Sequence, residues 1–217
     1  MSTLKRNATT TRARLAALLA LLLAAWAPLM AGEAPKVEPA KDGLKIDAGD
    51  FGAFTLTWPR LALAAGEEKP QDVTIDGNKA ALKYACGATL EVTVDGGDVA
   101  LKFAGLPAGA KKFLTDMVIP NGFAGANWKV AGETAGAGAF PKDKPEKPHL
   151  FQGNAKTLTF SDPKGRSMTV TAPAYTFIQL QDNREWNWEV YQMCLFTPIT
   201  PDTTDYSLSF SVIAGGK

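Results

Sequence analysis

The chain has 217 residues, of which 46% are hydrophobic, and its 23 basic residues nearly balance its 22 acidic ones. This length allows one domain with a substantial buried core. No nucleic-acid partner is expected, because proteins that bind nucleic acids usually carry a concentrated basic footprint. The one basic cluster, Lys142, Lys144 and Lys147, is interleaved with acidic residues and prolines, which is typical of a solvated loop.

The first 34 residues have the pattern of a secretory signal peptide. Four basic residues precede an apolar run over 15–27, and small residues follow at Ala31, Gly32 and Ala34. The run is shorter than the roughly 20 apolar residues of a membrane helix, so no stable membrane span is expected in the mature chain. We therefore expect a secreted or periplasmic protein whose residues 35–217 form a single domain. That part carries 19 basic and 21 acidic side chains.

The chain contains two cysteines, Cys86 and Cys194, both in segments that the pattern predicts as strands. In an oxidising compartment two such residues can form one disulfide, provided that their strands are neighbours. Two buried free thiols are the alternative, because cysteine is among the most frequently buried residue types.

Strands are predicted along most of the chain. Alternating apolar residues mark 44–48, 54–58, 73–75 and 80–84. The strongest hairpin signal is 90–103, where Gly96-Gly97 supplies the positive φ angles of a two-residue turn between two period-two apolar runs. Residues 113–120 predict another strand, with one helical turn as the alternative.

The second half is less regular at first. Residues 131–149, rich in Ala and Gly and then in Pro and Lys, are expected to form a mobile surface loop. Strands are predicted again over 157–160, 167–171, 175–180, 186–196 and 206–213. Roughly 10–13 short strands with turns between them predict an all-β fold, an antiparallel, jelly-roll-like β-sandwich.

Polar and aromatic residues are densest over 179–191. If 186–196 is one strand, Trp186 and Trp188 share a face, and exposed indoles there would stack on sugar rings while nearby polar groups bind hydroxyls. The alternative, which period-two spacing favours, is that both indoles line the sandwich core. The residues expected to contact a ligand are Trp186, Trp188, Asp182, Asn183, Arg184 and Tyr191, with Trp128 as a further candidate.

Catalysis is the less favoured hypothesis. Glu185 and Glu189 on one straight strand would lie about 13 Å apart, too far for a glycosidase pair. A lyase acting on uronic-acid polymers would need a base such as Tyr175 or Tyr191 and a cation such as Arg184 to neutralise the uronate.

Several other chemistries lack their motifs. The chain has one histidine, His149, and no Gly-x-Ser-x-Gly elbow, zinc-binding His-Glu-x-x-His helix or calcium loop. No catalytic residue, metal ligand or cofactor is therefore predicted. A structural Ca²⁺ held by backbone and scattered carboxylate oxygens would leave no such motif.

The string Gln-Asp-Asn-Arg-Glu-Trp at 181–186, between an apolar and an aromatic segment, resembles β-sandwich accessory domains of secreted bacterial proteins that handle polysaccharides. The resemblance implies a jelly-roll-like accessory or carbohydrate-binding domain and no catalytic residue. The leading hypothesis is an exported, non-catalytic module that binds a glycan or another cell-surface component. The alternatives are a polysaccharide lyase and a structural envelope protein that binds another protein.

Overall fold

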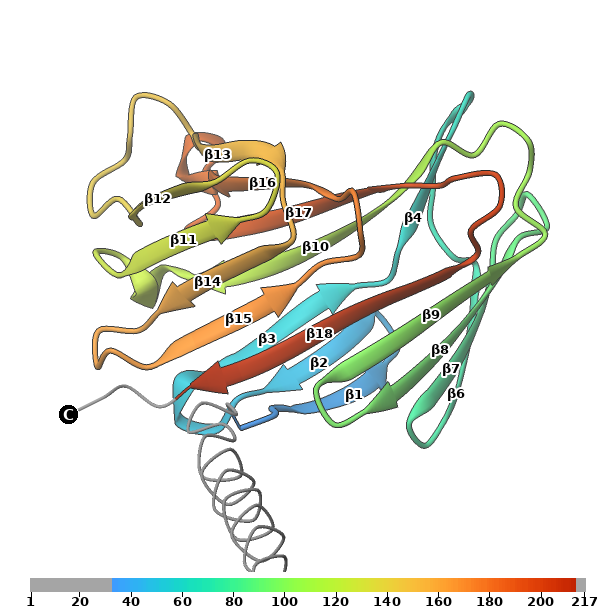
Figure 1. Ribbon diagram of the computed structural model, residues 1–217, viewed down its shortest axis with the longest axis horizontal. Coiled ribbons are helices and arrows are strands. Elements are labelled where there is room, and N and C mark those ends of the chain that lie inside the picture. The colour runs from blue at the N-terminus through green and yellow to red at the C-terminus, as the bar shows by residue number, and fades with distance from the viewer. Residues whose placement is uncertain (1–32, 214–217) are drawn as a thin grey trace, which may run out of the picture. The chain divides into compact units, whose positions relative to one another are not determined.

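The computed structural model describes residues 33–213, which lie in one compact unit and form two antiparallel β-sheets (Figure 1). The predicted all-β sandwich is therefore confirmed. Helical structure in the described range is limited to three short 3-10 turns, η1 (Gly49–Phe51), η2 (Asn121–Phe123) and η3 (Asn183–Trp186). None of the helices described is long and apolar enough to cross a membrane. The expected signal peptide lies, apart from Glu33 and Ala34, outside the described residues.

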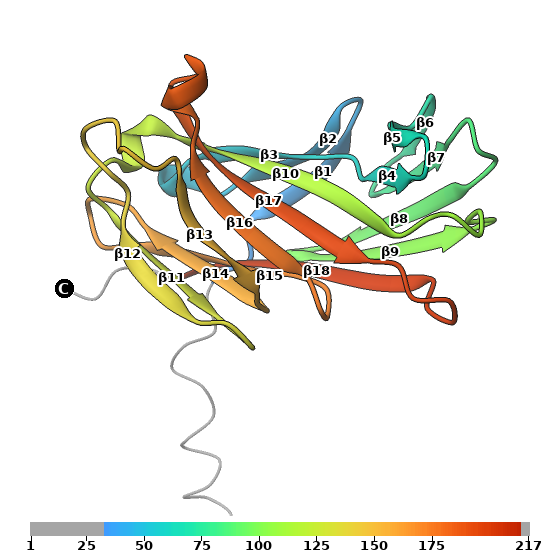
Figure 2. The same cartoon turned by 90° about the horizontal axis from the view of Figure 1, so that it is seen from above.

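Sheet I has nine strands. Their order is β1-β2-β3-β10-β17-β16-β13, and β4 pairs with both β10 and β5. The strands are β1 (Lys36–Ala40), β2 (Gly43–Asp47), β3 (Ala53–Thr57), β4 (Arg60–Leu63), β5 (Gly66–Glu68), β10 (Lys112–Pro120), β13 (His149–Asn154), β16 (Phe177–Asp182) and β17 (Val190–Pro198). The strands that matter for function, β13, β16, β17 and β10, are consecutive neighbours (Figure 2).

Sheet II also has nine strands, in the order β12-β11-β14-β15-β18-β9-β8-β7-β6. They are β6 (Asp72–Asp76), β7 (Lys79–Lys83), β8 (Thr89–Asp95), β9 (Asp98–Ala104), β11 (Asn127–Ala131), β12 (Gly136–Ala139), β14 (Thr157–Ser161), β15 (Ser167–Thr171) and β18 (Asp205–Ile213). The two sheets together exceed the expected number of strands, because short strands such as β1, β5 and β12 carry little apolar alternation.

The core lies between the sheets and follows from the period-two pattern. Alternate residues of β8 and β9, such as Leu90, Val92 and Leu101, are buried, and their neighbours in sequence are exposed. The turn between β8 and β9 is the predicted Gly96-Gly97, and Gly96 has a φ of 58°. A Cβ on Gly97 would lie 2.2 Å from the backbone oxygen of Phe210, so only glycine allows β18 to approach the turn.

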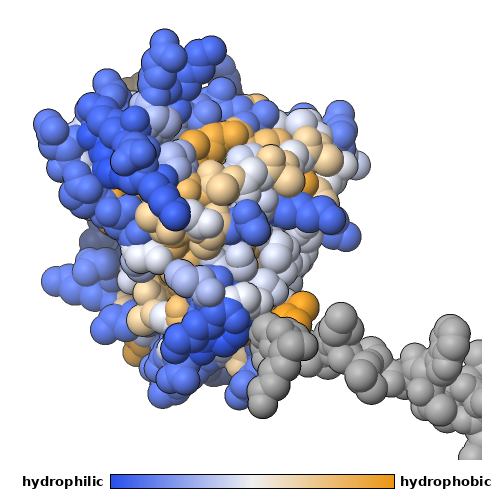
Figure 3. Space-filling model, turned by 90° about the vertical axis from the view of Figure 1, so that its left-hand side faces the viewer, coloured by the Kyte–Doolittle hydropathy of each residue, from blue (hydrophilic) through white to orange (hydrophobic). Residues whose placement is uncertain are grey.

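The segment 131–149 is not one continuous loop, which corrects the expectation in part. Gly136–Ala139 form β12, which pairs with β11. Its alternate glycines make room for an indole: a Cβ on Gly138 would lie 2.7 Å from Cζ2 of Trp128. The end of the unit where β11 and β12 lie shows an apolar band between hydrophilic margins (Figure 3).

The disulfide between Cys86 and Cys194 is not formed, and both cysteines are free. Cys86 lies in the turn between β7 and β8 of sheet II, not in a strand as predicted, whereas Cys194 lies in β17 of sheet I. The two thiols therefore belong to different sheets, so the requirement for neighbouring strands is not met.

Candidate functional site

The turn between β16 and β17 carries both predicted tryptophans. The predicted strand over 186–196 is wrong at its start: η3 ends at Trp186, and β17 begins only at Val190. Asp182 stops the strand because its carboxylate accepts a hydrogen bond from the Arg184 N–H at 3.0 Å, as an N-cap does. Asn187 then takes the left-handed conformation, φ 58°, which asparagine tolerates better than most residues.

Both indoles are exposed, contrary to the core interpretation that their spacing favoured. Trp186 is 54% exposed and Trp188 is 47% exposed. The spacing was misleading because the two residues do not lie on a strand at all. Trp186 is also close to the one histidine of the chain, with ring centroids of Trp186 and His149 6.4 Å apart.

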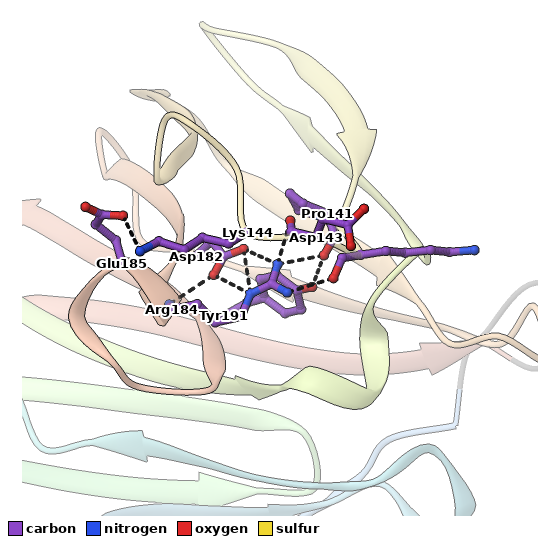
Figure 4. A network of polar contacts seen from close by, with 8 residues as sticks. Pro141, Asp143, Lys144, Asp182, Arg184, Glu185 and Tyr191 are labelled. Atoms are coloured by element: carbon purple, nitrogen blue, oxygen red, sulfur yellow. Dashed lines mark hydrogen bonds and ion pairs between the residues drawn. The ribbon is translucent and has the colours of Figure 1, made fainter.

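The Arg184 side chain bridges the turn and the segment that contains Pro141 and Asp143 (Figure 4). The Arg184 side chain is 10% exposed and forms an ion pair with the fully buried carboxylate of Asp182. Its guanidinium also donates to the carbonyl oxygens of Pro141, Lys142 and Asp143 at 2.8, 2.7 and 3.1 Å. Arg184 therefore ties the tryptophan turn to the irregular segment after β12.

Electrostatics reinforce this link. The hydrogen bond to Asp182 raises the pKa of the Arg184 guanidinium, so the arginine stays positively charged at every ordinary pH. An exposed ion pair, Lys144 Nζ to Glu185 Oε2 at 2.9 Å, joins the same two segments at the surface (Figure 4). The 3-10 turn is thus held by one buried and one solvated ion pair.

The expectation that Asp182, Asn183 and Tyr191 contact a ligand is corrected, because all three side chains are buried. The Tyr191 hydroxyl donates to the carbonyl oxygen of Pro141 at 2.5 Å, and Asn183 donates to Gln192 at 2.8 Å. These residues support the turn instead of presenting groups to solvent.

Trp128 is also buried, 8% exposed, which corrects its placement among the ligand-contacting candidates. Its indole lies against β12 and packs with Phe151 at a centroid distance of 6.2 Å. The period-two pattern of the short segment 127–131 points this residue inward.

That the outer face of β16 carries a connected row of amide side chains was not predicted from the sequence. Gln179 and Gln181 alternate with buried residues and join a chain of amides that runs through Gln152, Asn183 and Gln192. In register terms Gln152 lies opposite Gln179, and Gln181 lies opposite Gln192. The signal in the sequence was the amides at every second position, a pattern typical of a polar sheet face.

An open pocket of about 500 Å³ lies at the other end of the same face. Its lining comes from β10, β13, β16 and β17 and the segments next to them. The residues are Lys111, Lys112, Asn154, Tyr175, Phe177, Gln179, Phe196 and Pro198. Of these, the sequence singles out Tyr175, as a candidate lyase base.

Two residues of the lyase hypothesis, Tyr191 and Arg184, do meet at the Pro141 carbonyl oxygen, but the Tyr191 side chain is fully buried there. The hydroxyl of Tyr191 is engaged by a backbone carbonyl, and burial raises its pKa, which is opposite to what a catalytic base needs. Tyr175 and Arg184 flank β16 at its opposite ends. Nor is there, within 33–213, any group of three or more acidic, His or Cys side chains placed to hold a metal ion. What the outer face offers chemically is stacking and hydrogen bonding.

Comparisons place this chain only loosely among known proteins. No family model matches it, and no curated protein matches its sequence. Two solved structures are similar in part: an inverting mannosidase of family GH92 from Bacteroides thetaiotaomicron, with a TM-score of 0.40 and 6% identity, and a GH31 family sulfoquinovosidase from E. rectale, with a TM-score of 0.33 and 10% identity. The likenesses cover 84% and 83% of this chain but only 28% and 27% of those chains. Likenesses this low do not establish a shared fold, so the proposals below rest on the side chains of this protein.

Proposed function

We propose that this protein is an exported, non-catalytic module that binds a glycan or another cell-surface component. The observation that carries the proposal is the exposure of Trp186 and Trp188 on a turn that is anchored by Arg184. Indoles are costly to leave in water, and a folded chain usually buries most of their surface.

The anchoring matters for affinity. A ligand that meets an already ordered turn does not have to order it, so less of the interaction energy is lost on binding. The indole faces suit the apolar faces of sugar rings, and the exposed Asn187 and Glu189 beside them can meet hydroxyl groups. A flat protein-binding patch is the alternative, and it would need a larger continuous apolar area than these two side chains provide.

The test is a glycan array screen of the purified protein, followed by titration of each ligand against tryptophan fluorescence. Trp186→Ala and Trp188→Ala are each expected to weaken binding about tenfold, as expected for a residue that carries about 1.4 kcal/mol of affinity. Ile75→Ala is the matched control, because Ile75 is 41% exposed on β6 of the other sheet. Binding that is unchanged in both tryptophan variants, or no glycan ligand at all, would contradict the proposal.

A further inference from the structure

The pocket on the outer face of sheet I has the size and lining of a ligand site. Its volume of about 500 Å³ falls in the range of small-molecule sites, about 300–1,000 Å³. It combines aromatic rings, two amides and two ammonium groups on four neighbouring strands. We infer that this pocket binds an acidic sugar unit, bearing a carboxylate or sulfate, of the glycan that the tryptophan turn contacts. The inference rests on the proposed function and adds the class of ligand.

The aromatic wall of the pocket provides the stacking surface. Tyr175 is 78% exposed and Phe177 is 36% exposed. Phe177 lies directly opposite Phe196 on the next strand, with ring centroids 6.1 Å apart. The rings of Phe177 and Phe196 form an apolar wall on a sheet, whose backbone is more rigid than that of a loop, and Tyr175 adds a ring from the turn before β16.

Backbone strain at Tyr175 supports a functional role for its side chain. Its φ is 61°, a conformation that is unusual for any residue with a bulky side chain. The next residue holds it there: Thr176 is fully buried, and its hydroxyl lies 2.7 Å from the Pro173 carbonyl oxygen and 2.8 Å from Oγ1 of Thr197. Strain of this kind gathers at ligand-binding positions, where it directs a side chain toward a ligand.

The charge of the pocket selects an anionic ligand. Lys111 and Lys112 line it, and none of the described residues in its lining is acidic. Lys112 Nζ lies over the Phe196 ring, 4.9 Å from its centroid, so one ammonium is held beside the aromatic wall. A carboxylate or sulfate at this edge would meet two positive charges without a competing side-chain anion.

The amide chain connects this pocket to the tryptophan turn. Phe177 and Gln181 are four residues apart on β16, about 13 Å at 3.3 Å per residue. Gln181 lies opposite His149, whose ring neighbours Trp186. Each glutamine has two donors and an acceptor with two lone pairs, more than the bonds within the chain consume. The outer face of β16 can therefore form hydrogen bonds with an extended polymer that reaches from the pocket to the tryptophan turn.

The test uses pairs of oligosaccharides that share a backbone and differ in charge. One pair is a galacturonic acid hexasaccharide and its methyl ester, and the other is a sulfated oligosaccharide and its desulfated form. We expect at least one acidic member to bind about threefold to tenfold tighter than its neutral partner, and added salt to reduce that difference. The two pairs distinguish carboxylate from sulfate as the anion recognised.

Two variants separate the contribution of the positive charges from that of the aromatic ring. The double variant Lys111→Gln/Lys112→Gln should abolish the preference for the charged member, and Phe177→Ala should weaken binding of both members. Lys129→Gln is the control, because Lys129 is exposed on β11 of the other sheet. All of the altered side chains are exposed, so circular dichroism and melting should stay unchanged.

Each outcome has a distinct meaning. Glycan binding that needs Trp186 and Trp188 but is indifferent to the lysine and Phe177 variants overturns this inference and leaves the proposed function standing. Binding that needs Phe177 and the lysines but not the tryptophans supports the pocket and contradicts the role of the turn. Equal affinity for sodium polyglutamate, which has charge but no sugar rings, overturns the assignment to an acidic sugar, and no binding to any glycan overturns both proposals.

Discussion

Arg184 joins two segments of the chain that lie about forty positions apart in sequence. Its guanidinium reaches three backbone carbonyls of 141–143 while it neutralises Asp182. A buried carboxylate is costly without a counter-charge, so the two side chains depend on each other. At the residue scale, this pair is what holds the tryptophan turn in place.

Replacing Arg184 by alanine should therefore be severe. Arg184→Ala leaves Asp182 buried without its cation and is expected to lower the free energy of unfolding by about 3–5 kcal/mol. Lys144→Ala, which breaks the exposed pair with Glu185, should cost less than about 1 kcal/mol. Urea denaturation of both variants measures the difference, and similar midpoints would show that the buried pair has no special role.

At the element scale, β16 carries the proposed binding face, and both of its ends are fixed. Tyr175 before it and Asn187 after it are the two non-glycine residues of the described chain with positive φ. The first is unfavourable for its residue type and the second is well tolerated. The unfavourable φ of Tyr175 therefore lowers the stability of the folded protein at the end of β16 that borders the pocket.

Tyr175→Gly tests this trade-off. Glycine adopts positive φ without steric cost, so the variant should gain up to about 1 kcal/mol of stability while it loses ligand affinity. Tyr175→Ala keeps the strain and loses the ring, so it should show the same loss of affinity without the gain in stability. Thermal melts and ligand titrations of both variants would decide the matter. Unchanged affinity would remove Tyr175 from the site.

The edge strand β12 depends on its glycines in a different way. Gly138→Ala would place a Cβ 2.7 Å from the buried Trp128 ring and should cost about 1–3 kcal/mol by overpacking. Gly109→Ala, where a Cβ meets no atom within 4 Å, should stay near the stability of the parent protein. Chemical denaturation compares the two, and equal stability would mean that β12 moves away at no cost.

At the scale of the whole molecule, buried tyrosine and cysteine side chains make the free energy of unfolding depend on pH in the alkaline range. Burial raises the pKa of Tyr84, Tyr191 and Cys194 above their ordinary values of 10.0, 10.0 and 9.0. The folded state keeps these protons while the unfolded chain releases them from about pH 9 upward. The stabilisation is therefore complete below pH 9 and is lost as pH rises.

Unfolding midpoints in urea should accordingly be level up to about pH 9 and decrease from there to pH 10.5. Tyr84→Phe should flatten part of that slope, because it removes one of the retained protons. The substitution also removes the hydrogen bond from the Tyr84 hydroxyl to the Pro59 carbonyl, so the comparison is of slopes and not of absolute stability. Midpoints that are constant or rise over this range would contradict the prediction.

The all-β sandwich, much of the core and the hairpin at Gly96-Gly97 could be predicted from the amino-acid sequence alone. These features depend on residues close in the chain: period-two apolar runs choose the buried face, and turn residues set the reversals. The same local pattern also singled out 179–191, the segment that contains the two exposed tryptophans. The prediction that Trp186 and Trp188 lie on a strand was wrong, because the capping carboxylate of Asp182 starts a 3-10 turn there.

Which of those residues face solvent, and which neighbours they contact, depends on tertiary contacts between distant parts of the chain. The Tyr191 hydroxyl and the Arg184 guanidinium, which neutralises Asp182, bond to distant carbonyls of 141–143. The cysteines are free because their segments belong to different sheets. The pocket at Tyr175 joins Lys111, Asn154, Phe177 and Phe196 from four separate regions of the chain. Cross-strand register brings such residues together, and no local pattern encodes the pairing of strands far apart in sequence.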